Sequence, residues 1–214
     1  MPSLYRCRSS SAEIRDLFGC DVVEGMTWRS LVHPGQQGLV IRREGGRLKA
    51  ANLRWGISSS DEGQRTLLWT ERKPCAAAAF GSRRARPFRC LIVVDSFALP
   101  HGPAGQRMRS WFGLWDRPVF AWAGLWRATA TGDEGFIGAV TTANPLIRRV
   151  GPLMPVILAP ADYARWLFGT VKDVLPLWRR GFSSDAMWLE QTDELWTSGI
   201  CLDDLDARRA KYSD

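Results

Sequence analysis

The chain has 214 residues, of which 45% are hydrophobic and 24% are charged, so it is long enough to bury a sizeable core. It contains no run of about eighteen or more apolar residues, and its first residues lack the pattern of a secretion signal or a transit peptide. The net charge is +7, which excludes an acidic, self-repelling chain and is compatible with a polyanionic partner. We therefore expect a soluble cytoplasmic protein that spans no membrane.

The N-terminal third predicts one helix and one hairpin. Residues 11–19 begin with serine, carry Glu13 in the first turn, repeat apolar residues at helical spacing and end at glycine. Residues 38–58 alternate β-branched or aromatic residues with polar ones on both sides of Gly45–Gly46, which is typical of a hairpin. A further strand is predicted over 67–74, followed by a brief alanine-rich helix.

The middle of the chain predicts buried strands. The continuous apolar run at 90–99 indicates a strand that is buried on both faces. Residues 100–118 contain several prolines and glycines and are predicted to be a loop. Two more strands are expected over 119–129 and 135–144, because their apolar and β-branched residues flank a turn-forming segment.

The last third predicts a short strand at 155–160 and a helix over 160–169, after which the sequence has no clear period. We expect a mainly β (α+β) protein with a barrel-like sheet and a few peripheral helices. The predicted organisation is a domain over residues 1–170 and a C-terminal extension over 171–214, packed on that domain or trailing it.

The cysteines and histidines do not predict a metal site. Five cysteines occur at irregular spacing without a CxxC pair, and the chain has only two histidines, so neither a disulfide framework nor a zinc site is indicated. We interpret the cysteines as free thiols, partly buried as small apolar residues, and expect no cofactor and no metal. These cysteines are Cys7, Cys20, Cys75, Cys90 and Cys201.

Positive charge is concentrated in the first part of the chain. Residues 1–90 hold 16 Lys and Arg against 8 Asp and Glu, whereas residues 91–214 hold 13 against 14. Such a distribution fits a face that binds phosphates, although an arginine-rich solvated surface would look the same. The eleven tryptophans allow two interpretations as well, because aromatic rings fill cores more often than they stack on unpaired bases.

Six segments, in this order and at this spacing, resemble the SOS-response-associated peptidase (SRAP) family. They are RWGI (54–57), RCLIVVDSF (89–97), FAWAGLW (120–126), VTTAN (140–144), MPVIL (154–158) and YARWL (163–167). The resemblance runs from residue 1 to about 170. It implies recognition of single-stranded DNA and abasic sites, and a covalent link to the abasic sugar through an N-terminal cysteine, with a glutamate and a histidine moving protons.

This chain departs from the family at each reactive position. The register places Pro2 where the family has its cysteine, Leu31 where it has asparagine, Leu99 where it has the glutamate, and Gly151 where it has the histidine. The DNA-holding strand of the family falls on 69–74, where its key groups are also missing. The resemblance therefore implies a maintained scaffold without the family's chemistry, that is, a pseudoenzyme in a DNA-damage-response or phage-related setting.

Our leading hypothesis is a protein that binds single-stranded or abasic-site DNA through the basic first half of the chain. The candidate contacts are Arg6, Arg8, Arg54, Trp55, Arg72, Lys73, Arg83, Arg84, Arg86 and Arg89.

Two alternatives remain open. A trimmed chain would begin with the secondary amine of Pro2, which could form a reversible Schiff base with an abasic aldehyde. The segment 111–115 could instead be an exposed aromatic loop that contacts a protein partner, unless it packs against the domain. His101 could replace the missing base, but we interpret it as an exposed loop residue.

Overall fold

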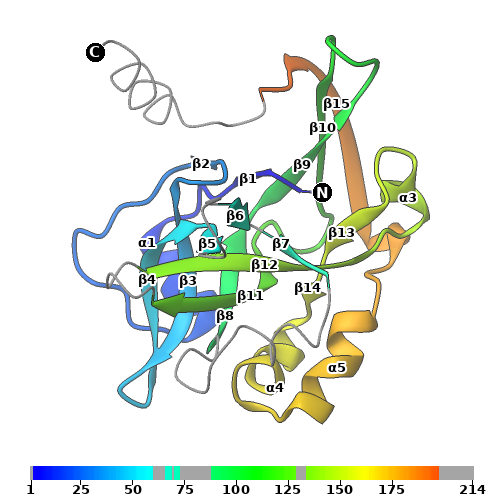
Figure 1. Cartoon of the computed structure of the whole chain (residues 1–214). Helices are drawn as coiled ribbons and strands as arrows, with labels where there is room; N and C mark the ends of the chain where they lie inside the picture. The colour runs from blue at the N-terminus through cyan, green and yellow to red at the C-terminus, as the bar shows by residue number, and fades with distance from the viewer. Residues whose placement is uncertain (1, 60–65, 69, 73–87, 129–133, 198–214) are drawn as a thin grey trace.

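The centre of the molecule is a closed ring of strands. The computed structural model describes residues 2–59, 66–68, 70–72, 88–128 and 134–197 (Figure 1). Strand β12 pairs in parallel with β4 and antiparallel with β11, and these two are joined through β3 and β8, so the sheet closes on itself. The ring consists of β3 (Gln37–Glu44), β4 (Arg47–Trp55), β8 (Phe88–Val94), β11 (Phe120–Ala128) and β12 (Glu134–Thr142).

Shorter strands extend this barrel. Strands β7, β13 and β14 pair with β12 or β11, and β5 pairs with β6 in a two-stranded sheet. Their bounds are β5 (Ile57–Ser59), β6 (Thr66–Leu68), β7 (Thr70–Glu71), β13 (Leu153–Pro155) and β14 (Ile157–Leu158). The mainly β, barrel-like fold predicted from the sequence is confirmed.

The predicted hairpin is β3 and β4. Gly45 and Gly46 connect the two strands with φ angles of 59° and 83°, a left-handed conformation that glycine adopts without strain. The strand expected over 90–99 is divided at Asp95: β8 belongs to the barrel, whereas β9 (Ser96–His101) belongs to a second sheet.

An aromatic cluster forms the centre of the core. The ring of Trp55 lies 5.0 Å from that of Tyr5, 5.8 Å from that of Trp122 and 6.4 Å from that of Phe136. All four side chains are fully buried. Tyr5 also restricts position 38 on β3 to glycine, because a Cβ atom there would lie 1.9 Å from the Tyr5 hydroxyl.

The second sheet has five strands in the order β15–β10–β9–β1–β2. These are β1 (Leu4–Arg6), β2 (Leu31–Val32), β9, β10 (Met108–Leu114) and β15 (Met187–Leu195). In Figure 1 this sheet lies in the upper part of the molecule, away from the C-terminal helices.

Strands β10 and β15 correct two predictions. Residues 100–118 are not one loop, because Pro100 and His101 still belong to β9 and Met108–Leu114 form β10. Consequently the segment 111–115 is not an exposed loop: Trp111 and Phe112 are fully buried in β10. The part of the chain after residue 170 contains regular structure although its sequence shows no clear period, because β15 pairs along β10.

The helix predicted over 11–19 is α1, whereas the one predicted over 160–169 divides into two elements. Ser10 and Glu13 form a capping box at the start of α1 (Ser11–Phe18), and Gly19 ends it in the left-handed region. The predicted helix over 160–169 is a 3₁₀ turn, η1 (Pro160–Asp162), followed by α4 (Tyr163–Phe168). The remaining elements are α3 (Pro145–Arg148), α5 (Val171–Arg179) and η2 (Ser184–Ala186).

Two tryptophans attach α4 and α5 to the barrel. The indole N–H of Trp166 donates to the carbonyl of Cys90 at 2.9 Å, and that of Trp178 donates to the carbonyl of Val140 at 3.2 Å. Their rings lie 5.8 Å apart. Among the described residues, no helix combines the length and the apolar character needed to cross a membrane.

The closure of the barrel at β11 and β12 should be sensitive to a single methyl group. A Cβ atom at Gly138 would lie 2.0 Å from a ring carbon of the buried Trp122, so Gly138→Ala should lower the free energy of unfolding by roughly 3 kcal/mol. The control Gly181→Ala meets no atom within 4 Å and should change it by less than about 0.5 kcal/mol. The two variants are compared by their urea denaturation midpoints. Equal midpoints would contradict the close packing of Trp122 against Gly138 between β11 and β12.

Candidate nucleic-acid interface

One face of the five-stranded sheet carries a tryptophan cluster. Because side chains alternate along a strand, Leu4 and Arg6 of β1 point to this face, whereas Tyr5 points to the barrel core. Leu4, Ala98 and Trp111 form a buried cluster here, and the partly buried side chains of Leu31, Trp188 and Trp196 pack against it. We call this surface the tryptophan face.

Arg6 lies over the centre of the tryptophan face. Its guanidinium carbon is 3.6 Å from the centre of the Trp111 ring, a cation–π contact. Burial lowers the pKa of Arg6, and so does the nearby charge of Arg8, whereas Glu194 and Glu190 oppose this change. An arginine side chain keeps its positive charge at neutral pH despite such a shift. The tryptophan face therefore carries a permanent positive charge stacked on the ring of Trp111.

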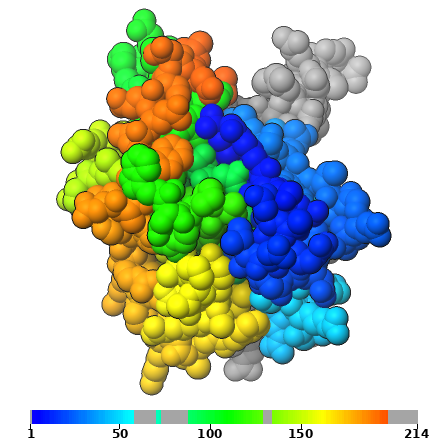
Figure 2. All heavy atoms as spheres, turned by 180° about the vertical axis from the view of Figure 1, so that it is seen from behind, coloured from blue at the N-terminus to red at the C-terminus, as the bar shows by residue number. Residues whose placement is uncertain are grey.

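A groove of about 540 Å³ runs beside this cation. It brings together Arg6 and Arg8 with Trp115, whose side chain is 71% exposed, and Trp188. Figure 2 shows this side of the molecule, where the N-terminal segment in blue, the β9–β10 region in green and β15 in orange meet. We call it the Arg6 groove.

The acidic side chains of the Arg6 groove are engaged by the backbone. Asp95 accepts hydrogen bonds from the Arg8 amide at 2.5 Å and from the Ser9 hydroxyl at 3.1 Å. Glu13 accepts from the amide and the hydroxyl of Ser10 at 2.7 and 2.8 Å. Burial raises the pKa of Asp95, although these hydrogen bonds partly oppose the effect. Both carboxylates therefore hold the loop that presents Arg8.

The predicted DNA contacts are only partly assembled. Arg6 and Arg8 lie together in the Arg6 groove. Arg54 is exposed near the end of β4, opposite Gln37 of β3, and Arg72 is exposed directly after β7. Four further candidates, Lys73, Arg83, Arg84 and Arg86, lie outside the residues that the structure describes.

Two predicted contacts are corrected. Trp55 is 0% exposed and contacts Tyr5 and Trp122, so its ring has no face left for a base. The guanidinium of Arg89 donates a hydrogen bond to the carbonyl of Gly169, which joins β8 to the end of α4. Burial lowers the pKa of Arg89, in keeping with a structural position.

Sequence reasoning missed Trp188 as part of this surface and placed both Trp111 and Trp115 in a possible protein-binding loop. The signal that could have found Trp111 is the two-residue alternation along β10, which puts Arg109, Trp111 and Gly113 on one face and Ser110 and Phe112 on the other. Gly113 lies under the ring of Trp188, because a Cβ atom there would be 2.3 Å from it.

A second cavity, of about 340 Å³, lies at the other end of β9. Leu99, His101, Arg107, Arg149 and Gly151 contribute to its lining, and we call it the Leu99 cavity. Leu99 is 1% exposed, and a Cβ atom at Gly151 would lie 3.5 Å from its Cδ1. His101 was predicted to be an exposed loop residue, but it is half-buried at the end of β9. Its Nδ1 lies 2.9 Å from the hydroxyl of Ser110.

The remaining positions of the motif comparison are apolar contacts. Pro2 is buried just before β1, and Leu31 packs against the tryptophan cluster. The described part of the chain contains no group of three or more His, Cys, Asp or Glu side chains that could hold a metal ion.

The sequence as a whole matches a known family. The profile of the SOS response associated peptidases (SRAP) covers residues 1–190. The chain belongs to the SRAP family. This match extends past residue 170 and includes α5 and the first residues of β15.

Solved structures share the SRAP fold of this chain. A protein from Bordetella bronchiseptica superposes with a TM-score of 0.73 at 21% identity, covering 89% of this chain and 99% of its own. A protein from Bacteroides thetaiotaomicron gives 0.68 at 17% identity, covering 88% and 90%. A phage-related protein from B. bronchiseptica gives 0.66 at 18% identity, covering 90% and 94%. A search of curated proteins finds no match.

The fold brings Leu99 and Gly151 together. These are the positions that the sequence analysis aligned with the glutamate and the histidine of the SRAP motifs, and both line the Leu99 cavity. This proximity is what a common reactive site requires.

The described thiols should be unreactive in the folded protein. Cys7, Cys20 and Cys90 are free and buried; burial raises the pKa of Cys7 and Cys90, and it raises that of Cys20 to about 11. The thiolate is the nucleophile, and roughly a thousandth of Cys20 is thiolate at pH 8, so labelling should be slow at pH 8 and should become faster as the pH approaches this pKa.

Alkylation with iodoacetamide tests this expectation by mass spectrometry in a Cys75→Ser/Cys201→Ser variant. At pH 8 the native chain should remain unmodified, whereas the chain in concentrated guanidinium chloride should gain three labels. Rapid labelling of the native chain would contradict the burial of these thiols.

Proposed function

We propose that this SRAP protein binds single-stranded DNA along the Arg6 groove. The observation that carries the proposal is the stacking of Arg6 on Trp111 beside Arg8 and the exposed Trp115. Grooves that hold single strands combine cations, which track the phosphates, with aromatic rings on which bases stack. Membership of the SRAP family supports the same function, because the resemblance to this family implies recognition of single-stranded DNA.

The groove assigns a role to each side chain. Arg8 is exposed and can neutralise a phosphate, while Arg6 supplies a second charge that Trp111 holds in place. Trp115 offers its ring to an unpaired base. Because its cations and rings stand on a sheet and on a loop held by Asp95, the groove needs little ordering upon binding.

We further propose that binding is not covalent. Leu99 and Gly151 bring a hydrocarbon side chain and a hydrogen atom to the cavity where SRAP chemistry would need a proton donor and a base. Pro2 provides no thiol, and its burial restricts the approach of an abasic aldehyde. The protein would then be a pseudoenzyme that holds damaged or single-stranded DNA in the cytoplasm, in a DNA-damage or phage-related setting.

DNA binding can be measured by fluorescence anisotropy with a labelled oligothymidine of about fifteen nucleotides, in roughly 50 to 200 mM salt. Arg8→Gln should weaken binding and lower the salt slope by about one, because it removes one phosphate contact. Trp115→Ala should weaken binding by roughly tenfold through lost stacking. Arg179→Gln on α5 is the matched control and should leave affinity unchanged. Absence of binding even at low salt would overturn the proposal.

The absence of a covalent product is tested with an abasic single-stranded oligonucleotide on a denaturing gel. We expect no slower band, either with or without borohydride, because the thiol, the carboxyl and the imidazole of the SRAP motifs are replaced. A strand without an abasic site serves as the control for nonspecific trapping. A band that depends on both the abasic site and borohydride would instead indicate a Schiff base at the amine of Pro2.

A further inference from the structure

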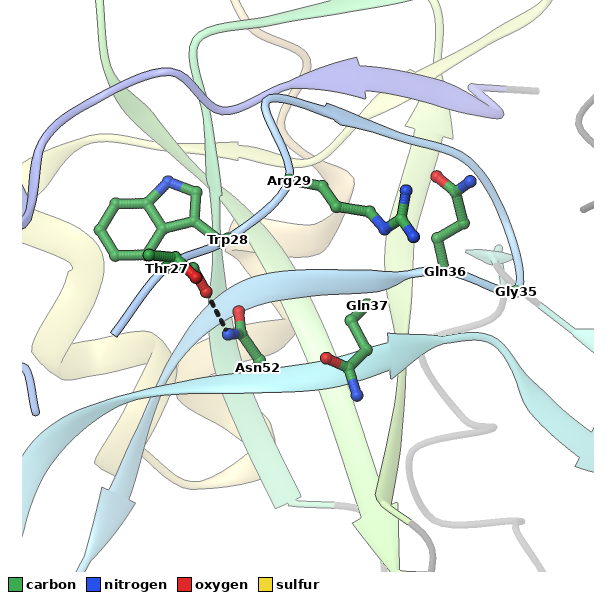
Figure 3. A pocket seen from close by; sticks show the side chains of 7 residues that line it. All are labelled: Thr27, Trp28, Arg29, Gly35, Gln36, Gln37 and Asn52. Carbon is green, nitrogen blue, oxygen red and sulfur yellow. Dashed lines mark hydrogen bonds between the residues drawn. The ribbon is translucent and has the colours of Figure 1, made fainter. Parts of the chain in front are cut away.

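A polar cavity of about 490 Å³ lies between the segment that precedes β2 and the strands β3 and β4 (Figure 3). Thr27, Trp28 and Arg29 border it on one side, and Gln36, Gln37 and Asn52 on the other. We call it the Asn52 cavity. Among the described residues that line it there is no carboxylate, while three carboxamides and one guanidinium are present.

Hydrogen bonds fix two of the carboxamides. The Asn52 amide donates to the carbonyl of Thr27 at 2.7 Å, which leaves its oxygen without a partner in the described part of the chain. The Gln36 oxygen accepts from the His33 amide at 3.1 Å, which leaves its NH₂ group as a donor. The wall of the cavity therefore holds an acceptor and a donor in defined orientations, and the exposed Gln37 adds one of each.

Backbone pairing between residues 6–7 and residues 30–31 places the Asn52 cavity next to the Arg6 groove. Arg6 pairs with Leu31, and the Cys7 amide donates to the Ser30 carbonyl at 3.0 Å. Arg8 and Arg29 are the next residues on these two segments; Arg8 lines the groove and Arg29 lines the cavity. A strand that leaves the groove at Arg8 would meet a second cation at the entrance of the cavity.

We infer that the Asn52 cavity takes one nucleotide of the bound strand and selects adenine. This inference rests on the proposed function and names a base-reading subsite for it. A carboxamide binds adenine with two hydrogen bonds, because it accepts from N6 and donates to N7. The corresponding edge of guanine offers two acceptors, O6 and N7, and thymine has no such edge because it lacks N7. Gln37 reads this edge beside Asn52, and Arg29 contacts the phosphate.

Titration of the full chain with dAMP, dGMP and dTMP, followed by NMR chemical shifts, tests the cavity without a strand. We expect dAMP to bind roughly fivefold or more tightly than the other two, and 7-deaza-dAMP, which lacks the N7 acceptor, to lose this advantage. Gln37→Leu should remove the preference, and Arg29→Gln should weaken all three mononucleotides alike. Both residues are exposed, so the variants should fold, and Gln106→Leu on an exposed turn is the matched control.

The outcomes separate this inference from the proposed function. Equal binding of the three mononucleotides, or a dAMP preference that survives in Gln37→Leu, overturns the adenine subsite even if oligothymidine binds to the groove. Failure of every strand to bind at low salt overturns the function of the groove, while a dAMP preference that depends on Gln37 would still support the cavity as a nucleotide site.

Discussion

The double pairing of β12 is the constraint on which the rest of the structure depends. β12 pairs with β4 on one edge and with β11 on the other, so the sheet has no free edge at this point. Closure surrounds Trp55, Trp122 and Phe136 and removes their rings from water. Trp122 also donates its indole N–H to the Ala139 carbonyl of β12 at 2.6 Å. Packing and hydrogen bonding thus both stabilise the pairing of β11 with β12.

The short strand β1 connects this core to the tryptophan face. Tyr5 enters the aromatic cluster, while its neighbours Leu4 and Arg6 point to the tryptophan face. Arg6 therefore cannot shift far from Trp111 without moving Tyr5, and the cation is held by the barrel itself. Trp122, Trp166 and Trp178 each donate the indole N–H to a backbone carbonyl, whereas the buried Trp111 N–H has no acceptor among the described residues.

The sequence predicted the parts of the fold that depend on local patterns. The capped helix at Ser10, the glycine turn of the hairpin and the apolar strands of the barrel each follow from a few neighbouring residues. β10 and β15 were missed because prolines and glycines flank the first, and because the second is mostly exposed along β10. Their pairing is a long-range contact that no short window contains.

The site was predictable only in its charges. Arg6 and Arg8 could be named because they are basic and near the start of the chain, but burial decides which aromatic residue serves a ligand. Trp55 follows an arginine and was therefore named as a stacking residue, yet it lies in the core, whereas Trp115 is exposed. The positions of Leu99 and Gly151 followed from motif order, and the contact between them came from the fold.

The fit of Tyr5 against Gly38 also constrains how such a chain can change over generations. The phenolic oxygen occupies the space that any side chain at position 38 would need. A lineage that replaces this glycine must first shorten the residue at position 5, so the two sites are expected to vary as a pair. Sequence change in β1 is in this way tied to sequence change in the barrel strand β3.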